Sequence, residues 1–166
     1  MPVALEPLTP AAFAPFGQVV AADVGQAIAA NQGTALRNNW AANLTNLRPH
    51  AKANLAVFQA VEQALPLELR LLERHPHSTQ AFLPLVVGRM LVCVAPNAAD
   101  GTPDLTQLRA FVGHSGQGVN YAVGTWHHPI VALDCDAELA MLAWEDGSAG
   151  DCEEFWLAAP VVVLAV

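Results

Sequence analysis

The chain has 166 residues, enough for one domain with a sizeable core, and it is 54% hydrophobic but only 13% charged. Its net charge of −8 argues against nucleic-acid binding, because a protein that holds phosphates needs clustered basic residues, and this chain has seven lysines and arginines in total. An anionic substrate would be repelled by this charge unless a local arginine, a metal ion or backbone N–H groups bind it.

Several bulk features predict where the protein acts and in what form. A surface with so few charges is itself apolar, and a homodimer is the simplest way to cover it. The three cysteines are far apart without a CxxC pair, which fits a reducing compartment, and no basic residue precedes Arg37 as a signal peptide would require. The longest apolar run, residues 155–166, contains Pro160 and is too short to span a membrane. We expect a soluble cytoplasmic protein with a single domain over residues 1–166.

Short strands and turns dominate the pattern along the chain. Thr9 followed by Pro10 predicts a capped helix of about one turn, and Asp104 is expected to cap one further helical turn. Strands are predicted at residues 3–5, 16–22, 55–60, 67–71, 79–87, 89–95, 109–112, 130–133, 138–144 and 155–166. Many short strands separated by Gly, Pro and Asn turns are typical of an all-β barrel or sandwich.

Residues 23–54 have the weakest pattern in the chain. Asn31-Gln32-Gly33-Thr34 has the composition of a turn, and asparagines are dense from residue 38 to residue 54. Two interpretations remain open, a long surface excursion or a segment that folds over the mouth of a pocket. In the second interpretation, Arg37 is the group that would bind an anion.

Two polar stretches, residues 73–82 and 118–129, hold four of the six histidines in otherwise aliphatic surroundings. On a strand, residues two apart face the same side. Glu73 and His75 are therefore expected to project together, and Arg74 is expected to point away from them. The two stretches are predicted to line one pocket inside a β-barrel.

Two further side chains are expected to join this pair. Gln80 follows His75 across a short turn and is predicted on the neighbouring antiparallel strand, and His127 follows a turn at Gly124. A carboxylate, two imidazoles and an amide can hold a divalent cation such as Ni²⁺, Zn²⁺ or Fe²⁺, and without metal they still supply an acid and a base. The predicted metal ligands are Glu73, His75, Gln80 and His127.

The spacing of these residues resembles the two motifs of cupin barrels in a degenerate form. Cupins carry His-x-His-x4-Glu and then Pro-x-Gly-x-x-His. Here the first motif reads Glu73-x-His75-x4-Gln80, so Glu and Gln stand in the places of the first His and the Glu. The second reads Ala122-x-Gly124-x-x-His127, so Ala takes the place of Pro.

Longer stretches carry a more specific resemblance. They are Leu72-Glu73-Arg74-His75-Pro76 with Thr79-Gln80-Ala81-Phe82-Leu83-Pro84, Pro103-Asp104-Leu105 with Leu108-Arg109-Ala110-Phe111, and Gln117-Gly118-Val119-Asn120-Tyr121 with Thr125-Trp126-His127-His128-Pro129. In order and spacing they are similar to the ureidoglycolate lyase family over roughly residues 65–152. Weaker matches extend the resemblance over nearly the whole chain.

The resemblance implies a cupin-type antiparallel β-barrel or jelly roll with a few short helices, usually as a homodimer. It implies cleavage of (S)-ureidoglycolate to glyoxylate and urea late in allantoin breakdown, and a divalent metal, usually nickel. The expected catalytic residues are Glu73, His75 and His127, and the expected substrate-binding residues are Asn31, Arg37, Tyr121 and Trp126. The family commonly has an aromatic-His-Asp run after the arginine that matches Arg37. This chain has Asn38-Asn39-Trp40 there, so Asn39 is the nearest replacement for that histidine.

Other functions compete with this one. A non-catalytic cupin that binds a small carboxylate or sugar is favoured by the substituted motif, although 166 residues leave no room for an output domain. A metal-dependent isomerase or dioxygenase would require the fuller His-x-His ligand set. The residues alone leave open whether His75 or His127 acts as the base.

Overall fold

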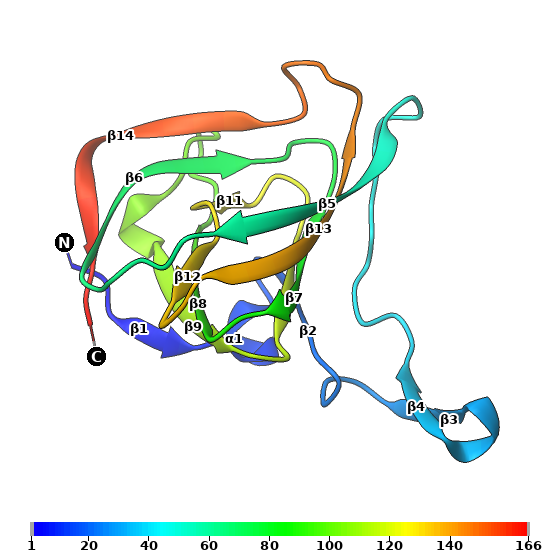
Figure 1. Ribbon diagram of the computed structural model, residues 1–166. Coiled ribbons are helices and arrows are strands. Elements are labelled where there is room, and N and C mark those ends of the chain that lie inside the picture. The colour runs from blue at the N-terminus through cyan, green and yellow to red at the C-terminus, as the bar shows by residue number, and fades with distance from the viewer. Residues whose placement is uncertain (1, 166) are drawn as a thin grey trace.

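The computed structural model describes residues 2–165, and strands dominate it (Figure 1). In chain order, the elements are β1 (Leu5–Pro7), α1 (Pro10–Phe13), β2 (Gly17–Val20), β3 (Ala27–Ala30), the single turn η1 (Asn31–Gly33), β4 (Ala35–Asn38), β5 (Lys52–Ala60), β6 (Leu67–Arg74), β7 (Gln80–Val86), β8 (Arg89–Ala95), the single turn η2 (Leu105–Gln107), β9 (Arg109–His114), β10 (Gly118–Tyr121), β11 (Trp126–His127), β12 (Val131–Leu133), β13 (Ala137–Glu145) and β14 (Glu153–Val163). Among the described residues, no helix is long and apolar enough to cross a membrane.

Two sheets form the body of the molecule. The seven-stranded sheet has the order β1-β9-β8-β11-β6-β14, with β12 paired to β8, and the five-stranded sheet has the order β2-β10-β7-β13-β5. Neighbouring strands in the five-stranded sheet are antiparallel throughout, and β1 joins β9 in a parallel pair at the edge of the larger sheet. Figure 1 shows the two sheets curving around a common interior. The predicted all-β fold, an antiparallel barrel with a few short helices, is confirmed.

The core divides into two clusters of buried side chains. The larger cluster includes Phe13, Phe111 and Tyr121, and the smaller one includes Leu72 and Trp126. Side chains on a strand alternate between faces, so β11 places Trp126 in the smaller cluster and directs His127 to the other side. This alternation brings a polar residue into an apolar barrel.

The helix caps and one strand are found where the local sequence predicts them. Thr9 caps α1 by accepting a hydrogen bond of 3.2 Å from the N–H of Ala12, and Asp104 caps η2 in the same way at Thr106. The strand predicted at residues 89–95 has the observed bounds of β8. The last predicted strand extends to residue 166, which lies outside the described residues.

The predicted position of Gln80 on the strand next to Glu73 and His75 is wrong. Gln80 opens β7, which lies in the five-stranded sheet, whereas β6 lies in the seven-stranded sheet. The turn after His75 therefore crosses from one sheet to the other. Gln80 faces the other residues across the interior of the barrel rather than along one sheet.

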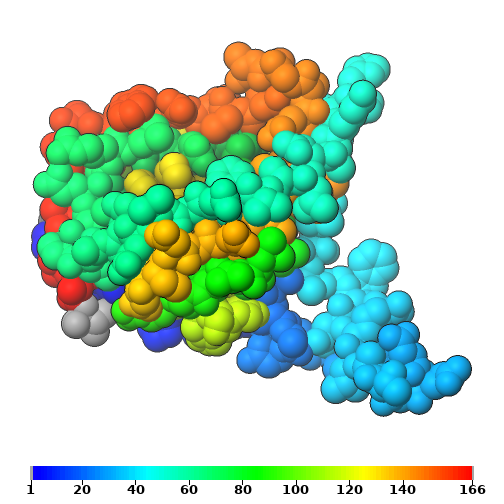
Figure 2. Space-filling view, viewed as in Figure 1, coloured from blue at the N-terminus to red at the C-terminus, as the bar shows by residue number. Residues whose placement is uncertain are grey.

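Residues 23–54 contain a hairpin that the sequence pattern does not predict. Strands β3 and β4 pair with each other around the turn at residues 31–33 and project from the barrel (Figures 1 and 2). The surface-excursion interpretation is therefore the one that the structure supports for this hairpin. Beyond it, residues 43–48 return to the barrel, where Asn46 forms a bridge with Ser78.

Candidate functional site

Strand pairing brings the two polar stretches together. His127 on β11 lies directly opposite Glu73 on β6 in an antiparallel pair. Gly124 has a φ of +73°, a conformation that favours glycine, and its N–H donates a hydrogen bond of 2.9 Å to the carbonyl of His75. The turn that leads into β11 is therefore tied to the end of β6.

Three side chains offer metal-ligand atoms within a small volume. One ligand atom each from Glu73, His75 and His127 lies within 4.8 Å of the other two. The two imidazole rings stack with centroids 5.5 Å apart. His127 is 1% exposed and His75 8% exposed, so most of this polar cluster is removed from water.

The hydrogen bond at Nδ1 of His127 defines its tautomer, and the Nε2 atom then faces the carboxylate of Glu73. Its Nδ1 lies 2.9 Å from the carbonyl of Thr125, and because a carbonyl only accepts, Nδ1 carries the proton. In a neutral ring, Nε2 then has only a lone pair. It faces Oε1 of Gln80 at 3.1 Å and Oε1 of Glu73 at 3.4 Å. Rotating the Gln80 amide by about 180° would turn its NH₂ group toward Nε2 and make that contact a hydrogen bond. The contact with the Glu73 carboxylate is favourable only with a proton on Nε2 or a cation between Nε2 and the carboxylate.

His75 is held in the same tautomer by a different partner. Its Nδ1–H donates a hydrogen bond of 2.8 Å to the backbone carbonyl of Asp151. Its Nε2 is buried and has no hydrogen-bond partner among the described residues. A buried nitrogen with a free lone pair is costly unless something binds it, so this atom is suited to receive a cation or a proton.

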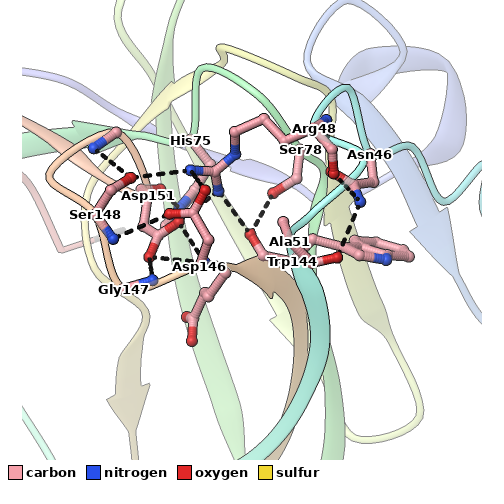
Figure 3. A network of polar contacts seen from close by, with 12 residues as sticks. Asn46, Arg48, Ala51, His75, Ser78, Trp144, Asp146, Gly147, Ser148 and Asp151 are labelled. Carbon is pink, nitrogen blue, oxygen red and sulfur yellow. Dashed lines mark hydrogen bonds and ion pairs between the residues drawn. The ribbon is translucent and has the colours of Figure 1, made fainter.

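Arg48 holds the loop that supplies this carbonyl (Figure 3). Its guanidinium group pairs with the carboxylates of Asp146, at 3.0 Å, and Asp151, and donates to the carbonyl of Trp144 at 3.2 Å. The carboxylate of Asp151 also accepts the N–H of Gly147 at 2.7 Å. The sequence does not predict this network, because Arg48 and Asp151 are 103 residues apart and no local pattern links them.

The electrostatic surroundings favour an ionised carboxylate on Glu73 and neutral rings on His75 and His128. Burial acts to raise the pKa of Glu73, but the hydrogen bond and charge of His127, with smaller contributions from His75 and His128, hold that pKa below its ordinary value. Burial, followed by the neighbouring His127, lowers the pKa of His75, and burial also lowers the pKa of His128. The Sγ atom of Cys152 lies 3.8 Å from Oε2 of Glu73, and burial together with that carboxylate raises the pKa of the thiol to about 12. Cys152 is therefore a protonated thiol and not a nucleophile.

The family of the chain follows from a match along nearly its entire length. The family model described as ureidoglycolate lyase matches residues 1–164. The chain belongs to the ureidoglycolate lyase family. The ureidoglycolate lyase of Pseudomonas syringae pv. tomato is 36% identical to it over 154 residues, which cover 93% of this chain and 89% of that protein. The ureidoglycolate lyase of Azotobacter vinelandii is 38% identical, with 92% of this chain and 90% of that protein covered.

Two solved structures resemble this member of the ureidoglycolate lyase family at a distance. A 3,4-ketoisomerase from Helicobacter canadensis superimposes with a TM-score of 0.46 at 14% identity, covering 82% of this chain and 88% of that one. The WlaRB TDP-quinovose 3,4-ketoisomerase from Campylobacter jejuni gives 0.45 at 14% identity, covering 81% and 89%. At this distance, they carry no argument about the function of this chain.

The substrate-binding residues expected of a ureidoglycolate lyase lie in three different places. The ring of Tyr121 stacks on that of His127, with centroids 4.0 Å apart, and its hydroxyl is buried without a partner among the described residues. Trp126 lies on the opposite face of β11, where its N–H donates to the carbonyl of Gly101 at 3.1 Å. Asn31 and Arg37 are exposed on the projecting hairpin. Of the four, the structure brings only Tyr121 into contact with the cluster.

The donor set fits a divalent cation. It combines two imidazole nitrogens and a carboxylate, with the amide oxygen of Gln80 beside them, and such mixed sets suit Ni²⁺, Zn²⁺ and Fe²⁺. The free Nε2 of His75 and the crowded Nε2 of His127 are the atoms that a cation would satisfy. We therefore regard Glu73, His75 and His127 as the candidate metal centre of this ureidoglycolate lyase family member.

Proposed function

We propose that this protein cleaves (S)-ureidoglycolate to glyoxylate and urea, as a step of allantoin and purine breakdown. The observation that carries the proposal is the cluster of Glu73, His75 and His127 in a chain of the ureidoglycolate lyase family. The cluster supplies a carboxylate and two imidazoles in a nearly dry interior, which are the groups that acid–base cleavage of this substrate needs.

The reaction requires one proton to leave the substrate and one to arrive. Ureidoglycolate is a carbinolamine, with a hydroxyl group and a ureido nitrogen on the same carbon. When the hydroxyl loses its proton, the C–O bond becomes the aldehyde of glyoxylate and the C–N bonding pair leaves with the nitrogen. That nitrogen takes up a proton to give urea. A well-placed proton transfer contributes about 10²–10⁴-fold to the rate.

The residues present would hold a divalent cation, and we propose Ni²⁺. Glu73, His75 and His127 would bind it, with Gln80 beside them. When bound, such a cation would act as a Lewis acid that polarises the carboxylate and hydroxyl oxygens of the substrate.

The free nitrogen of His75 has one of two roles. Its Nε2 lone pair can be given to a cation or can accept the hydroxyl proton, but one lone pair cannot do both at once. The Nδ1–H group of His127 donates a hydrogen bond to the carbonyl of Thr125 and keeps its proton. Its Nε2 is therefore the atom that carries or releases a proton beside Glu73. The stacked ring of Tyr121 fixes the plane of His127. We propose that all three clustered residues are catalytic, either as ligands or as acid and base.

The setting of the enzyme is also part of the proposal. We propose that residues 1–166 act as one domain, that the protein is a homodimer, and that it works in the cytoplasm. The free cysteines Cys93, Cys135 and Cys152 are consistent with a reducing compartment. The low charge content is consistent with a subunit interface.

An assay of both products tests the proposal against its non-catalytic alternative. Purified protein supplied with Ni²⁺ or Mn²⁺ is incubated with (S)-ureidoglycolate, and urea and glyoxylate are measured separately. The proposal predicts equal amounts of both, released faster than in a protein-free control. A protein that only binds small carboxylates would be stabilised against heating by glyoxylate yet release neither product above the control.

A further inference from the structure

The projecting hairpin lacks a core of its own. We call residues 26–40 the arm. Strands β3 and β4 pair only with each other among the described residues, and Asn38 ties the arm to its base by donating to the carbonyl of Ala22 at 2.7 Å. An isolated two-stranded hairpin is at best marginally stable in water. The arm therefore needs a surface to pack against.

The arm exposes apolar side chains that its own barrel does not cover. Trp40 is 90% exposed, Leu36 is 76% exposed, and Ile28 is also exposed. Figure 2 shows the arm standing clear of the barrel on one side of the molecule. A cluster of exposed apolar groups of this size on a short segment marks a contact surface.

The barrel has an apolar face of its own. We call the outward side chains of β5, β13 and β7 the outer face. Across these strands, Ala140 lies between Val57 and Leu83, and Leu142 lies between Leu55 and Ala81. Leu55 is 73% exposed, and Val57 and Leu83 are exposed as well. β5 is also the edge strand of its sheet, so its outer backbone groups are open to a further chain.

The arm and the outer face meet at a groove. This groove, with a volume of about 460 Å³, lies at the base of the arm and is lined by Trp40, Leu44, Leu83 and Leu142, among others. One continuous apolar surface therefore runs from the arm onto the sheet. Arg37 is the only charged residue of the arm, so the charge of the arm is opposite in sign to the net charge of −8 that a further copy carries. A second copy related by a two-fold axis buries both surfaces at once, because each copy supplies one arm and one face.

Two arginines near the candidate site are already engaged with carboxylates of their own chain. Arg74 is engaged with Glu153 at 2.7 Å, and Arg48 is engaged with Asp146 and Asp151. Arg37 forms no ion pair in the described part of the chain, but on its own subunit it projects away with the arm. In a second copy that receives the arm, its guanidinium group would be free to bind the substrate carboxylate.

We propose that the arm of one copy packs on the outer face of a second copy and delivers Arg37 to the active site of that copy. The exchange is reciprocal, so each site combines Glu73, His75 and His127 of one chain with the guanidinium group of the other. The part that concerns Arg37 rests on the proposed function, in which the substrate carries a carboxylate. The part that concerns the arm and the outer face stands without it.

The mass of the protein in solution tests the arm contact. Sedimentation of the wild-type chain is expected to give twice the chain mass of 17.5 kDa. Trp40→Asp and Leu55→Asp, which place a charge on the arm and on the outer face, are each expected to give monomers. Trp156→Asp is the matched control, because Trp156 is 68% exposed but lies on β14, outside both surfaces, and this variant is expected to remain a dimer. A monomeric wild type, or dimers that survive both interface substitutions, would overturn the contact.

Mixed dimers test the delivery of Arg37. Arg37→Ala and His127→Ala are each expected to be inactive alone, but co-expression is expected to restore activity, because random pairing leaves about a quarter of all sites with both wild-type residues. If the co-expressed pair is no more active than the two variants measured separately, Arg37 does not act in the second copy.

A readout that does not need activity separates this inference from the proposed function. The photo-cross-linking residue benzoylphenylalanine, placed at position 37, is expected to give covalent dimers. Mass spectrometry is expected to locate the new bond near residues 75–80 or 146–152 of the other chain. Cross-links confined to the same chain would overturn the exchange even if the enzyme cleaves ureidoglycolate. An inactive wild type with the expected cross-links would contradict the proposed function alone.

Discussion

The Nδ1–H group of His75 donates a hydrogen bond of 2.8 Å to the backbone carbonyl of Asp151, and this one contact decides which nitrogen faces the interior of the site. It leaves Nε2 of His75 buried with a free lone pair beside Glu73 and His127. The carbonyl is in place because Arg48 pairs with the carboxylate of the same aspartate (Figure 3). Arg48 is therefore a positioning residue that acts on the site through a loop.

Arg48→Ala is expected to weaken binding of Ni²⁺ about 10–100-fold, the usual effect of removing a group that orients a metal ligand. The reason is that the loop of Asp151 loses its anchor and His75 loses its fixed tautomer. Calorimetric titration gives the affinity, and nitrogen chemical shifts of the His75 ring in metal-free protein report the tautomer directly. Arg70→Ala is the control, since Arg70 forms an exposed pair with Glu68. An Arg48→Ala protein with unchanged affinity and tautomer would show that the loop holds its shape unaided.

The stability of the metal-free protein is expected to fall as the pH drops below 6.5. The pKa of His75 lies below 6.5 in the folded protein, so the unfolded chain binds a proton more strongly and is favoured as the pH falls through that range. His128 acts in the same direction, and Glu73, with a pKa below 4.5, adds a further loss at lower pH. Urea unfolding in the presence of a chelator, from pH 7 to about pH 5, measures the slope.

His75→Gln provides the internal comparison for this slope. The variant removes one group whose pKa is lowered by folding, so part of the pH dependence should disappear. His77→Gln, at an exposed position in the same turn, should keep the slope of the wild type. Identical slopes in the wild type and His75→Gln would mean that His75 does not contribute to the effect.

Tyr121→Phe is expected to leave the free energy of unfolding nearly unchanged or to raise it slightly. The hydroxyl of Tyr121 is buried without a partner among the described residues, so its removal loses no hydrogen bond and relieves a buried polar group. The ring that stacks on His127 is retained. Denaturant unfolding and kcat/KM are measured together. A large loss of kcat/KM with normal stability would instead mean that the hydroxyl binds substrate, as the family resemblance implies.

Gly124→Ala is expected to destabilise the protein by about 1 kcal/mol or more and to reduce activity. At a φ of +73°, an alanine is strained, and this turn carries both the hydrogen bond to His75 and the entry to His127. Gly116→Ala introduces similar strain, at a φ of +88°, in a turn outside the site. The two variants should lose similar stability, but only Gly124→Ala should lose activity per folded molecule. Equal activity in both would argue that this turn does not position His127.

The sequence predicts the site where its geometry is local. The two-residue period of β6 places Glu73 and His75 on one side and Arg74 on the other, and Arg74 does point outward to Glu153. The turn at Gly124 brings His127 to the same place. These predictions rest on alternation and turn chemistry, which depend on a few neighbouring residues.

The sequence does not predict what depends on distant partners. The sequence predicts Gln80 on the neighbouring strand, but the pairing of β7 with β10 and β13 is decided by segments far along the chain. The network of Arg48 joins residues about a hundred positions apart, and neither end has a distinctive local pattern. The hairpin at residues 27–38 lacks the alternation of a half-buried strand, because its own chain covers neither face. A contact with a second copy, as proposed for the arm, would bury these side chains.

One comparison between the wild type and Glu73→Gln tests the central claim most directly. For each protein, the rate of glyoxylate release and the amount of bound metal are both measured. Glutamine keeps the shape of Glu73 but removes the charge that faces His127. The wild type should release glyoxylate and urea in equal amounts with about one Ni²⁺ per chain, and Glu73→Gln should fold normally yet lose most of both activity and metal. A Glu73→Gln protein that cleaves (S)-ureidoglycolate at the wild-type rate, or a wild type with no activity in Ni²⁺ or Mn²⁺, would contradict the assignment of this cluster as the catalytic centre.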